Sequence, residues 1–159
     1  MIKVGDHFPE VTFTVMTSDG PKPKTSDEIF KGKKVVLFGL PGAFTPTCHR
    51  NHLPGYRDNY DALKAKGVDT IAVTAVNDVF VMGAWRDATN SGDKVEFLAD
   101  GSANFAKAAG LTLDLTERGL GLRMRRFSML VVDGVVKTMN LEEGTGAEAS
   151  GAAAMLEQV

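Results

Sequence analysis

Short runs of consecutive apolar residues recur along the chain. Residues 33–40, 68–76 and 95–99 are each nearly continuous in apolar side chains. This pattern is typical of strands that are buried on both faces of a sheet. Even the densest run falls far short of the ~20 apolar residues that a membrane span requires. The sequence therefore predicts three internal strands.

Segments between and after these runs carry apolar residues at helical spacing. In residues 53–63 they recur at steps of three, four and three. Pro54 is expected to kink this helix or to mark its first turns. Residues 80–88 form an apolar stripe behind a potential helix cap, Asn77-Asp78. A further short helix is expected over residues 103–109, ended by the glycine that follows.

The two ends of the chain complete the pattern. Residues 127–141 hold two β-rich runs on either side of Asp133-Gly134, which is a strong hairpin signal. Residues 11–15 alternate in character and predict an N-terminal hairpin or extension. The alanine-rich tail, about 150–159, predicts a last helix. This order predicts one α/β domain, residues 1–159, with a mixed sheet that is parallel first and antiparallel at its end.

Composition narrows the functional classes. The 159 residues are 43% hydrophobic and carry a net charge of −2, which argues against a nucleic-acid or membrane-surface binder driven by bulk charge. The chain has one cysteine, Cys48, so it can form no internal disulfide and no multi-cysteine metal site. An unpaired thiol suits a reducing compartment, and the N-terminus resembles no secretory signal. We therefore expect a soluble cytoplasmic protein.

The position of Cys48 suits a reactive thiol. Residues 41–48 (PGAFTPTC) connect a buried strand to a helix, a junction that lies at the sheet edge where α/β sites form. In the first helical turn, unpaired N–H groups and the helix dipole favour a thiolate. Thr45 can place its hydroxyl beside the sulfur, and Pro41 and Pro46 stiffen the loop. The alternative is that Cys48 is a small buried residue without reactivity.

The same segment resembles the peroxiredoxin active-site pattern Pro-x-x-x-Thr-x-x-Cys, and its full string resembles the type II (peroxiredoxin-5-like) subfamily. Further pieces match in family order: HLPG at 52–55, AKG at 65–67, VNDVFV at 76–81, FLADG at 97–101 and RFSM at 126–129. The resemblance implies a thioredoxin-like fold with a mixed central sheet flanked by helices and an N-terminal β extension. Threonine then stands where a thioredoxin has the first cysteine of Cys-x-x-Cys, so dithiol exchange is not expected.

The resemblance also implies a peroxidase and assigns roles to four residues. The Cys48 thiolate attacks a hydroperoxide, Thr45 orients the peroxide and contacts the sulfur, and Pro41 shields the sulfenic acid. An arginine from a later strand region stabilises the thiolate and the transition state, and the family register points to Arg123. Strand alternation places Arg123 and Arg125 on one face and Arg126 on the other, where Arg126 would pair with an acid or support a dimer surface.

The partners follow from the cysteine count. The subfamily's two positions for a second, resolving cysteine hold Ala72 and the segment Glu148–Ser150, which lack sulfur. The resemblance therefore implies a one-cysteine enzyme that reduces hydrogen peroxide and alkyl hydroperoxides. An external thiol would resolve the sulfenic acid, with glutathione and glutaredoxin first and thioredoxin second. It also implies a homodimer with no cofactor, no metal, no nucleic acid and no membrane partner.

Other interpretations remain open for several of these residues. Cys48 oxidation could serve a non-enzymatic redox sensor, or the chain could be a binding module with an inert cysteine. Cys48, His49 and His52 could suggest a metal site, but no closing carboxylate is evident. The arginines from 118 to 126 could suggest a phosphate patch, which the net charge disfavours. Three aromatic residues could line a hydrophobic substrate entrance, although packing in the core or at an interface is their ordinary role: Phe44, Phe80 and Trp85.

Overall fold

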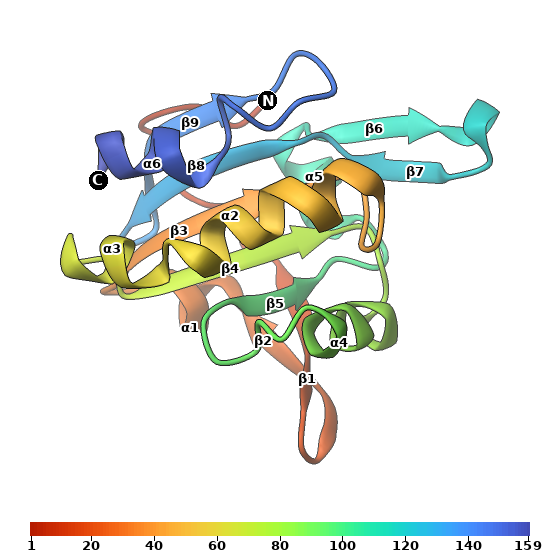
Figure 1. Ribbon diagram of the computed structural model, residues 1–159, viewed down its shortest axis with the longest axis horizontal. Coiled ribbons are helices and arrows are strands. Elements are labelled where there is room, and N and C mark those ends of the chain that lie inside the picture. Colours follow the sequence, from red (N-terminus) through yellow and green to blue (C-terminus); the bar gives the residue numbers. More distant parts are fainter.

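The computed structural model describes residues 1–159 and has a seven-stranded mixed sheet at its centre (Figure 1). The strand order is β2-β1-β5-β4-β3-β8-β9, and a separate two-stranded sheet pairs β6 with β7. The strands are β1 (Thr12–Thr17), β2 (Gly20–Thr25), β3 (Lys34–Gly39), β4 (Thr70–Ala75), β5 (Glu96–Ala99), β6 (Thr112–Leu115), β7 (Gly121–Met124), β8 (Phe127–Val132) and β9 (Val135–Leu141).

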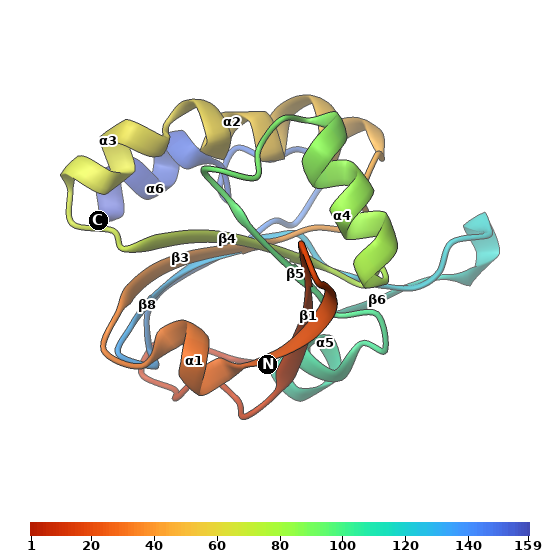
Figure 2. The ribbon, with the colours of Figure 1, turned by 90° about the horizontal axis from the view of Figure 1, so that it is seen from below.

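Helices cover both faces of the large sheet. Figure 2 shows α2, α3, α4 and α6 on one face and α1 and α5 on the other. None of these helices is long and apolar enough to cross a membrane. The helices are α1 (Ser26–Phe30), α2 (Leu53–Asp58), α3 (Tyr60–Ala65), α4 (Val79–Ala88), α5 (Asn104–Ala109) and α6 (Ala152–Gln158), with the π-helical turn η1 (Cys48–His52) and the short 3₁₀ helix η2 (Thr116–Arg118).

Strand β3 shows why the internal strands are continuously apolar. Val36 and Phe38 pack in the core beneath α2 and α4, whereas Val35 and Leu37 pack in the core beneath α1 and α5. All four side chains are fully buried. A strand covered on both faces needs apolar residues at odd and even positions alike.

The predicted strand directions are confirmed. β3, β4 and β5 pair in parallel, and β8 pairs with β3 antiparallel. The predicted turn at Asp133-Gly134 joins β8 to β9, with both turn residues at positive φ. The N-terminal segment forms the hairpin β1–β2, which joins the large sheet through β5.

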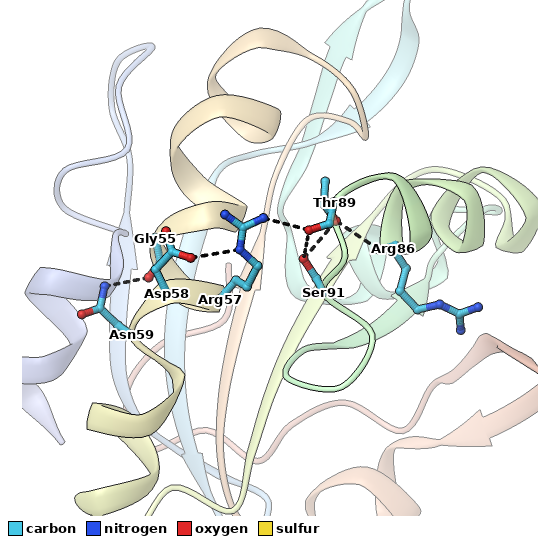
Figure 3. A network of polar contacts seen from close by, with 7 residues as sticks. All are labelled: Gly55, Arg57, Asp58, Asn59, Arg86, Thr89 and Ser91. Atoms are coloured by element: carbon cyan, nitrogen blue, oxygen red, sulfur yellow. Dashed lines mark hydrogen bonds and ion pairs between the residues drawn. The ribbon is translucent and has the colours of Figure 1, made fainter.

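A network of polar contacts fixes the helix that follows the π-turn (Figure 3). The expected helix over residues 53–63 is divided at Asn59, whose side-chain amide donates to the Gly55 carbonyl at 2.7 Å. Pro54 lies in the first turn of α2, as predicted. From α2, Arg57 donates to the carbonyl of Thr89 at the end of α4 (2.8 Å). These contacts anchor the elements on which the candidate site is built.

The hairpin β6–β7 was not apparent in the sequence pattern. It extends away from the rest of the protein in both views (Figures 1 and 2). β7 ends at Met124 and β8 begins at Phe127, so Arg125 and Arg126 lie between two strands that belong to different sheets. The strand alternation predicted for the arginines therefore does not continue through these two residues.

Candidate active site

Cys48 lies in the first turn of the helical segment that follows β3. The backbone N–H of His49 donates to the Thr45 carbonyl (2.8 Å), which places Thr45 at the helix start. The first N–H groups of a helix have no partner within it, so they are available near Cys48. The π-turn η1 is closed by the Leu53 N–H, which donates to the Cys48 carbonyl. Both Cys48 and His52 of this turn are buried.

A buried guanidinium contacts the sulfur. Arg126 Nη2 donates to Cys48 Sγ at 3.0 Å, and the arginine is only 8% exposed. Arginine stays protonated at any physiological pH. A fixed positive charge in contact with sulfur, away from water, stabilises a thiolate there. The geometry therefore suits a cysteine that acts as a nucleophile.

The expectation that Arg123 supplies this charge is wrong. Arg123 donates to the carbonyls of Leu120 (2.8 Å) and Pro41 (3.1 Å) instead. The physical reason is the break after Met124, which turns Arg126 into the core beside the π-turn. Arg126 therefore does not have the acid-pairing or surface role that strand alternation suggested. Arg125, beside it, forms only a long 3.8 Å ion pair with Glu143.

Thr45 and Pro41 occupy the loop around the sulfur. The Thr45 hydroxyl donates to the Gly42 carbonyl at 2.6 Å, rather than to the sulfur. Because its hydrogen is used in this way, its oxygen remains free to accept a hydrogen bond from a ligand. The Pro41 carbonyl is held by Arg123, whose Nη1 would lie 2.4 Å from a Cβ on Gly42. A glycine at position 42 is therefore needed for this close approach.

His52 connects Arg126 to the C-terminal segment. Arg126 Nη1 lies 3.0 Å from His52 Nδ1, and His52 Nε2 lies 3.0 Å from the Ser150 carbonyl. Arginine can only donate and a carbonyl can only accept, so Nδ1 accepts and Nε2 carries the hydrogen. The ring also packs against Phe38, with 4.9 Å between centroids. In the sequence, His52 stood out only as part of a possible metal site with Cys48 and His49, and its contact with Arg126 was not predicted.

Burial lowers the pKa of His52 from 6.5 to about 4, and the nearby Arg126 charge acts in the same direction. The unfolded chain therefore binds a proton at this residue at a higher pH than the folded chain does. Its stabilising contribution is complete above pH 6.5 and is lost as the pH falls toward about 4. A neutral His52 is thus part of the folded state.

We expect the free energy of unfolding to fall by about 3 kcal/mol through His52 alone over that interval. Urea unfolding measured across it should show this slope in the wild type. His52→Gln removes the titrating ring, so its free energy of unfolding should fall by about 3 kcal/mol less than that of the wild type over the same pH interval. Equal slopes in the two proteins would contradict the assigned neutral ring.

A pocket of about 490 Å³ adjoins the site between the active-site loop and the β6–β7 hairpin. Its lining includes Pro41 and Thr45 of the active-site loop and three arginines: Arg118, Arg125 and Arg126. Leucines of the hairpin region supply an apolar wall: Leu113, Leu115 and Leu120. Two glutamates, Glu142 and Glu143, also line the pocket. The pocket thus offers apolar surface and cationic groups beside the buried sulfur.

Comparisons with known proteins agree with this geometry. The sequence profile of the Redoxin family matches residues 3–156. The chain is 46% identical over 156 residues to peroxiredoxin-2C from Oryza sativa subsp. japonica, covering 98% of this chain and 96% of that protein. The chain belongs to the peroxiredoxin family. With its single cysteine and its likeness to curated peroxiredoxin-2 proteins, it is a type II peroxiredoxin, and the family is one of thiol-dependent peroxidases.

Two further relatives support the assignment. Peroxiredoxin-2E-2, chloroplastic, from the same rice is 47% identical over 160 residues, covering 98% of this chain and 71% of that protein. The crystal structure of reduced Prx3 in complex with H₂O₂ from Vibrio vulnificus superposes with a TM-score of 0.95. It is 47% identical and covers 99% of each chain. The expected thioredoxin-like fold of this peroxiredoxin is thereby confirmed.

Proposed function

We propose that this peroxiredoxin reduces hydrogen peroxide and alkyl hydroperoxides through a sulfenic acid on Cys48, and that an external thiol then restores the cysteine. The observation that carries the proposal is the contact between Arg126 and the Cys48 sulfur at 3.0 Å. The Vibrio vulnificus structure named above contains H₂O₂, which favours the smallest hydroperoxide as a substrate.

The proposed chemistry is a displacement at oxygen. The thiolate attacks one peroxide oxygen, a sulfur–oxygen bond forms, and the oxygen–oxygen bond breaks. The other oxygen leaves with the electron pair and takes up a proton to become water or an alcohol, while Cys48 becomes a sulfenic acid. Arg126 stabilises the negative charge in the transition state. The Thr45 oxygen accepts a hydrogen bond from the peroxide, and Pro41 shields the sulfenic acid from further oxidant.

We propose glutathione as the external thiol, with glutaredoxin completing the cycle and thioredoxin as the second candidate. Glutathione would attack the sulfenic acid, release water and leave a mixed disulfide, which a second thiol then reduces. The chain itself contains no second cysteine to do this. Arg118 and Arg125 in the adjoining pocket suit the two carboxylates of glutathione.

A reductant comparison tests this assignment. Glutathione should form a mixed disulfide with oxidised Cys48, detected by mass, and glutaredoxin should clear it. Arg125→Gln should slow mixed-disulfide formation about fivefold, because it removes one partly exposed charge contact. Arg50→Gln is the control, since Arg50 is exposed and lies outside the pocket. Efficient turnover with thioredoxin but none with glutathione and glutaredoxin would overturn the choice of reductant.

We also propose that the protein is a cytoplasmic homodimer. Phe44 and Phe80 are 50% and 66% exposed, and the Phe44 ring lies 6.4 Å from that of Trp85 on α4. Exposed aromatic residues of this kind favour burial against another protein surface. The reducing conditions of the cytoplasm suit an enzyme that depends on an external thiol.

Phe80→Asp should convert the dimer to a monomer, because a buried carboxylate without a partner is costly at an interface. Sedimentation equilibrium of both proteins measures this directly. Phe44 lies beside α4 and belongs to the same exposed patch, so Val4→Asp, at an apolar residue that is 58% exposed, serves as the matched control. A wild-type protein that is monomeric at all concentrations would contradict the proposal.

A further inference from the structure

Arg126 is held on the side away from the sulfur by a second set of contacts. One guanidinium nitrogen donates to Cys48 Sγ, and the other donates to His52 Nδ1, each at 3.0 Å. The His52 ring is in turn fixed by Ser150, because its Nε2–H donates to the Ser150 carbonyl. Arg126, His52 and Ser150 are all buried. The position of the guanidinium therefore depends on a residue in the C-terminal segment.

Ser150, the last residue in this series of hydrogen bonds, is held in place by further contacts. Glu142 accepts hydrogen bonds from the backbone N–H and the hydroxyl of Ser150, at 2.8 and 2.7 Å, and from the Ala149 N–H at 3.2 Å. Tyr56 of α2 donates to the same Ser150 carbonyl at 2.6 Å. Partial burial raises the pKa of Glu142, but these hydrogen bonds together outweigh burial and hold the pKa below its usual value, so the carboxylate is ionised at neutral pH. The Glu142 carboxylate thus holds the two ends of the segment 142–150 together beside the site.

We propose that His52 and Glu142 are positioning residues that hold Arg126 against Cys48, so that closure of the segment 142–150 sets how fast Cys48 reacts with peroxide. The inference rests on the peroxidase chemistry proposed above. Neither residue forms a hydrogen bond with the sulfur, whose side-chain partner is Arg126. His52 acts through Arg126, and Glu142 acts through Ser150 and His52.

A direct acid–base role for His52 does not fit the contacts. Both ring nitrogens are engaged, one as acceptor and one as donor. His52 is absent from the pocket lining, whereas Arg126 is part of it. The groups that face the ring are Arg126, Ser150, Phe38 and Tyr56, with Glu142 beyond Ser150. A fixed scaffold is the function that this arrangement supports.

The first test measures the oxidation of Cys48 by hydrogen peroxide without any thiol. Glu142→Ala should slow this reaction by about tenfold to a hundredfold, since small displacements of a catalytic group have effects of this size. Glu142→Gln keeps one acceptor oxygen and should recover part of the rate. The matched control is Glu148→Ala, which removes the same charge from the same segment, where the side chain is exposed and forms no hydrogen bond. It should react like the wild type.

The second test separates positioning from packing at His52. His52→Phe keeps a buried ring but offers Arg126 no acceptor, so the oxidation of Cys48 should slow. His52→Asn can offer an oxygen near the place of Nδ1, so it should react faster than His52→Phe. If folded His52→Phe and Glu142→Ala proteins react at the wild-type rate, the inference is overturned. A wild-type protein that does not react at all would instead refute the proposed function.

Discussion

Replacing Arg126 by methionine will slow the oxidation of Cys48 by hydrogen peroxide about 100-fold to 1000-fold, the cost of removing one preorganised donor from a reacting oxygen. The guanidinium lies 3.0 Å from the sulfur and lines the pocket beside the active-site loop. Methionine fills much of the same volume without charge or donors. Stopped-flow mixing of reduced protein with peroxide measures the rate.

Arg123→Met provides the comparison, because it removes the same charge three residues away. Arg123 holds the Pro41 carbonyl rather than the sulfur, so we expect an effect at least tenfold smaller than that of Arg126→Met. Unfolding in urea shows whether each variant remains folded at the temperature of the assay. A larger loss of rate in Arg123→Met than in Arg126→Met would restore the arginine assignment that the sequence suggested.

Gly39→Ala will destabilise the fold by about 3 kcal/mol or more, at the upper end of overpacking costs. An added Cβ would lie 2.1 Å from Phe127 Cε1 and 2.9 Å from Met124 Sδ. Both neighbours are fully buried, so neither side chain can move into solvent. Phe127 follows Arg126 directly, so displacement of its ring should also slow Cys48 oxidation. Urea unfolding and the peroxide reaction measure the two effects.

Two further variants separate this clash from a general effect of adding a methyl group. Gly146→Ala should leave stability within about 0.5 kcal/mol of the wild type, because nothing lies within 4 Å of its Cβ position. Phe127→Leu should partly relieve the clash, so the double variant should be more stable than the sum of the two single changes predicts. Simple additivity would contradict the predicted contact.

The fold was largely predictable because local signals agreed with tertiary packing. The continuous apolar runs became strands covered on both faces, and Asp78 caps α4 by accepting from the Val81 N–H at 2.9 Å. Asp133 and Gly134 adopt the positive φ angles that their hairpin requires. The location of Cys48 after a buried strand could also be predicted from the sequence. Each of these features depends on residues close together in the sequence.

The rest of the site depends on contacts across long sequence distances. Arg126 meets Cys48 over a separation of 78 residues, and His52 meets Ser150 over 98. Residues 122–127 look like one strand in the sequence, yet they join two sheets, so neither the family register, which pointed to Arg123, nor strand alternation placed Arg126 beside Cys48. The spacing of four between Cys48 and His52 was a usable signal, since it places both on one helical face.

The most direct test of the account is the mass of Cys48 after one equivalent of hydrogen peroxide without thiol. The account predicts that the wild type consumes one peroxide per chain and gains one oxygen atom at Cys48, while Cys48→Ser does neither. If Cys48→Ser consumes peroxide as fast as the wild type, Cys48 is not the reacting group and the account is wrong.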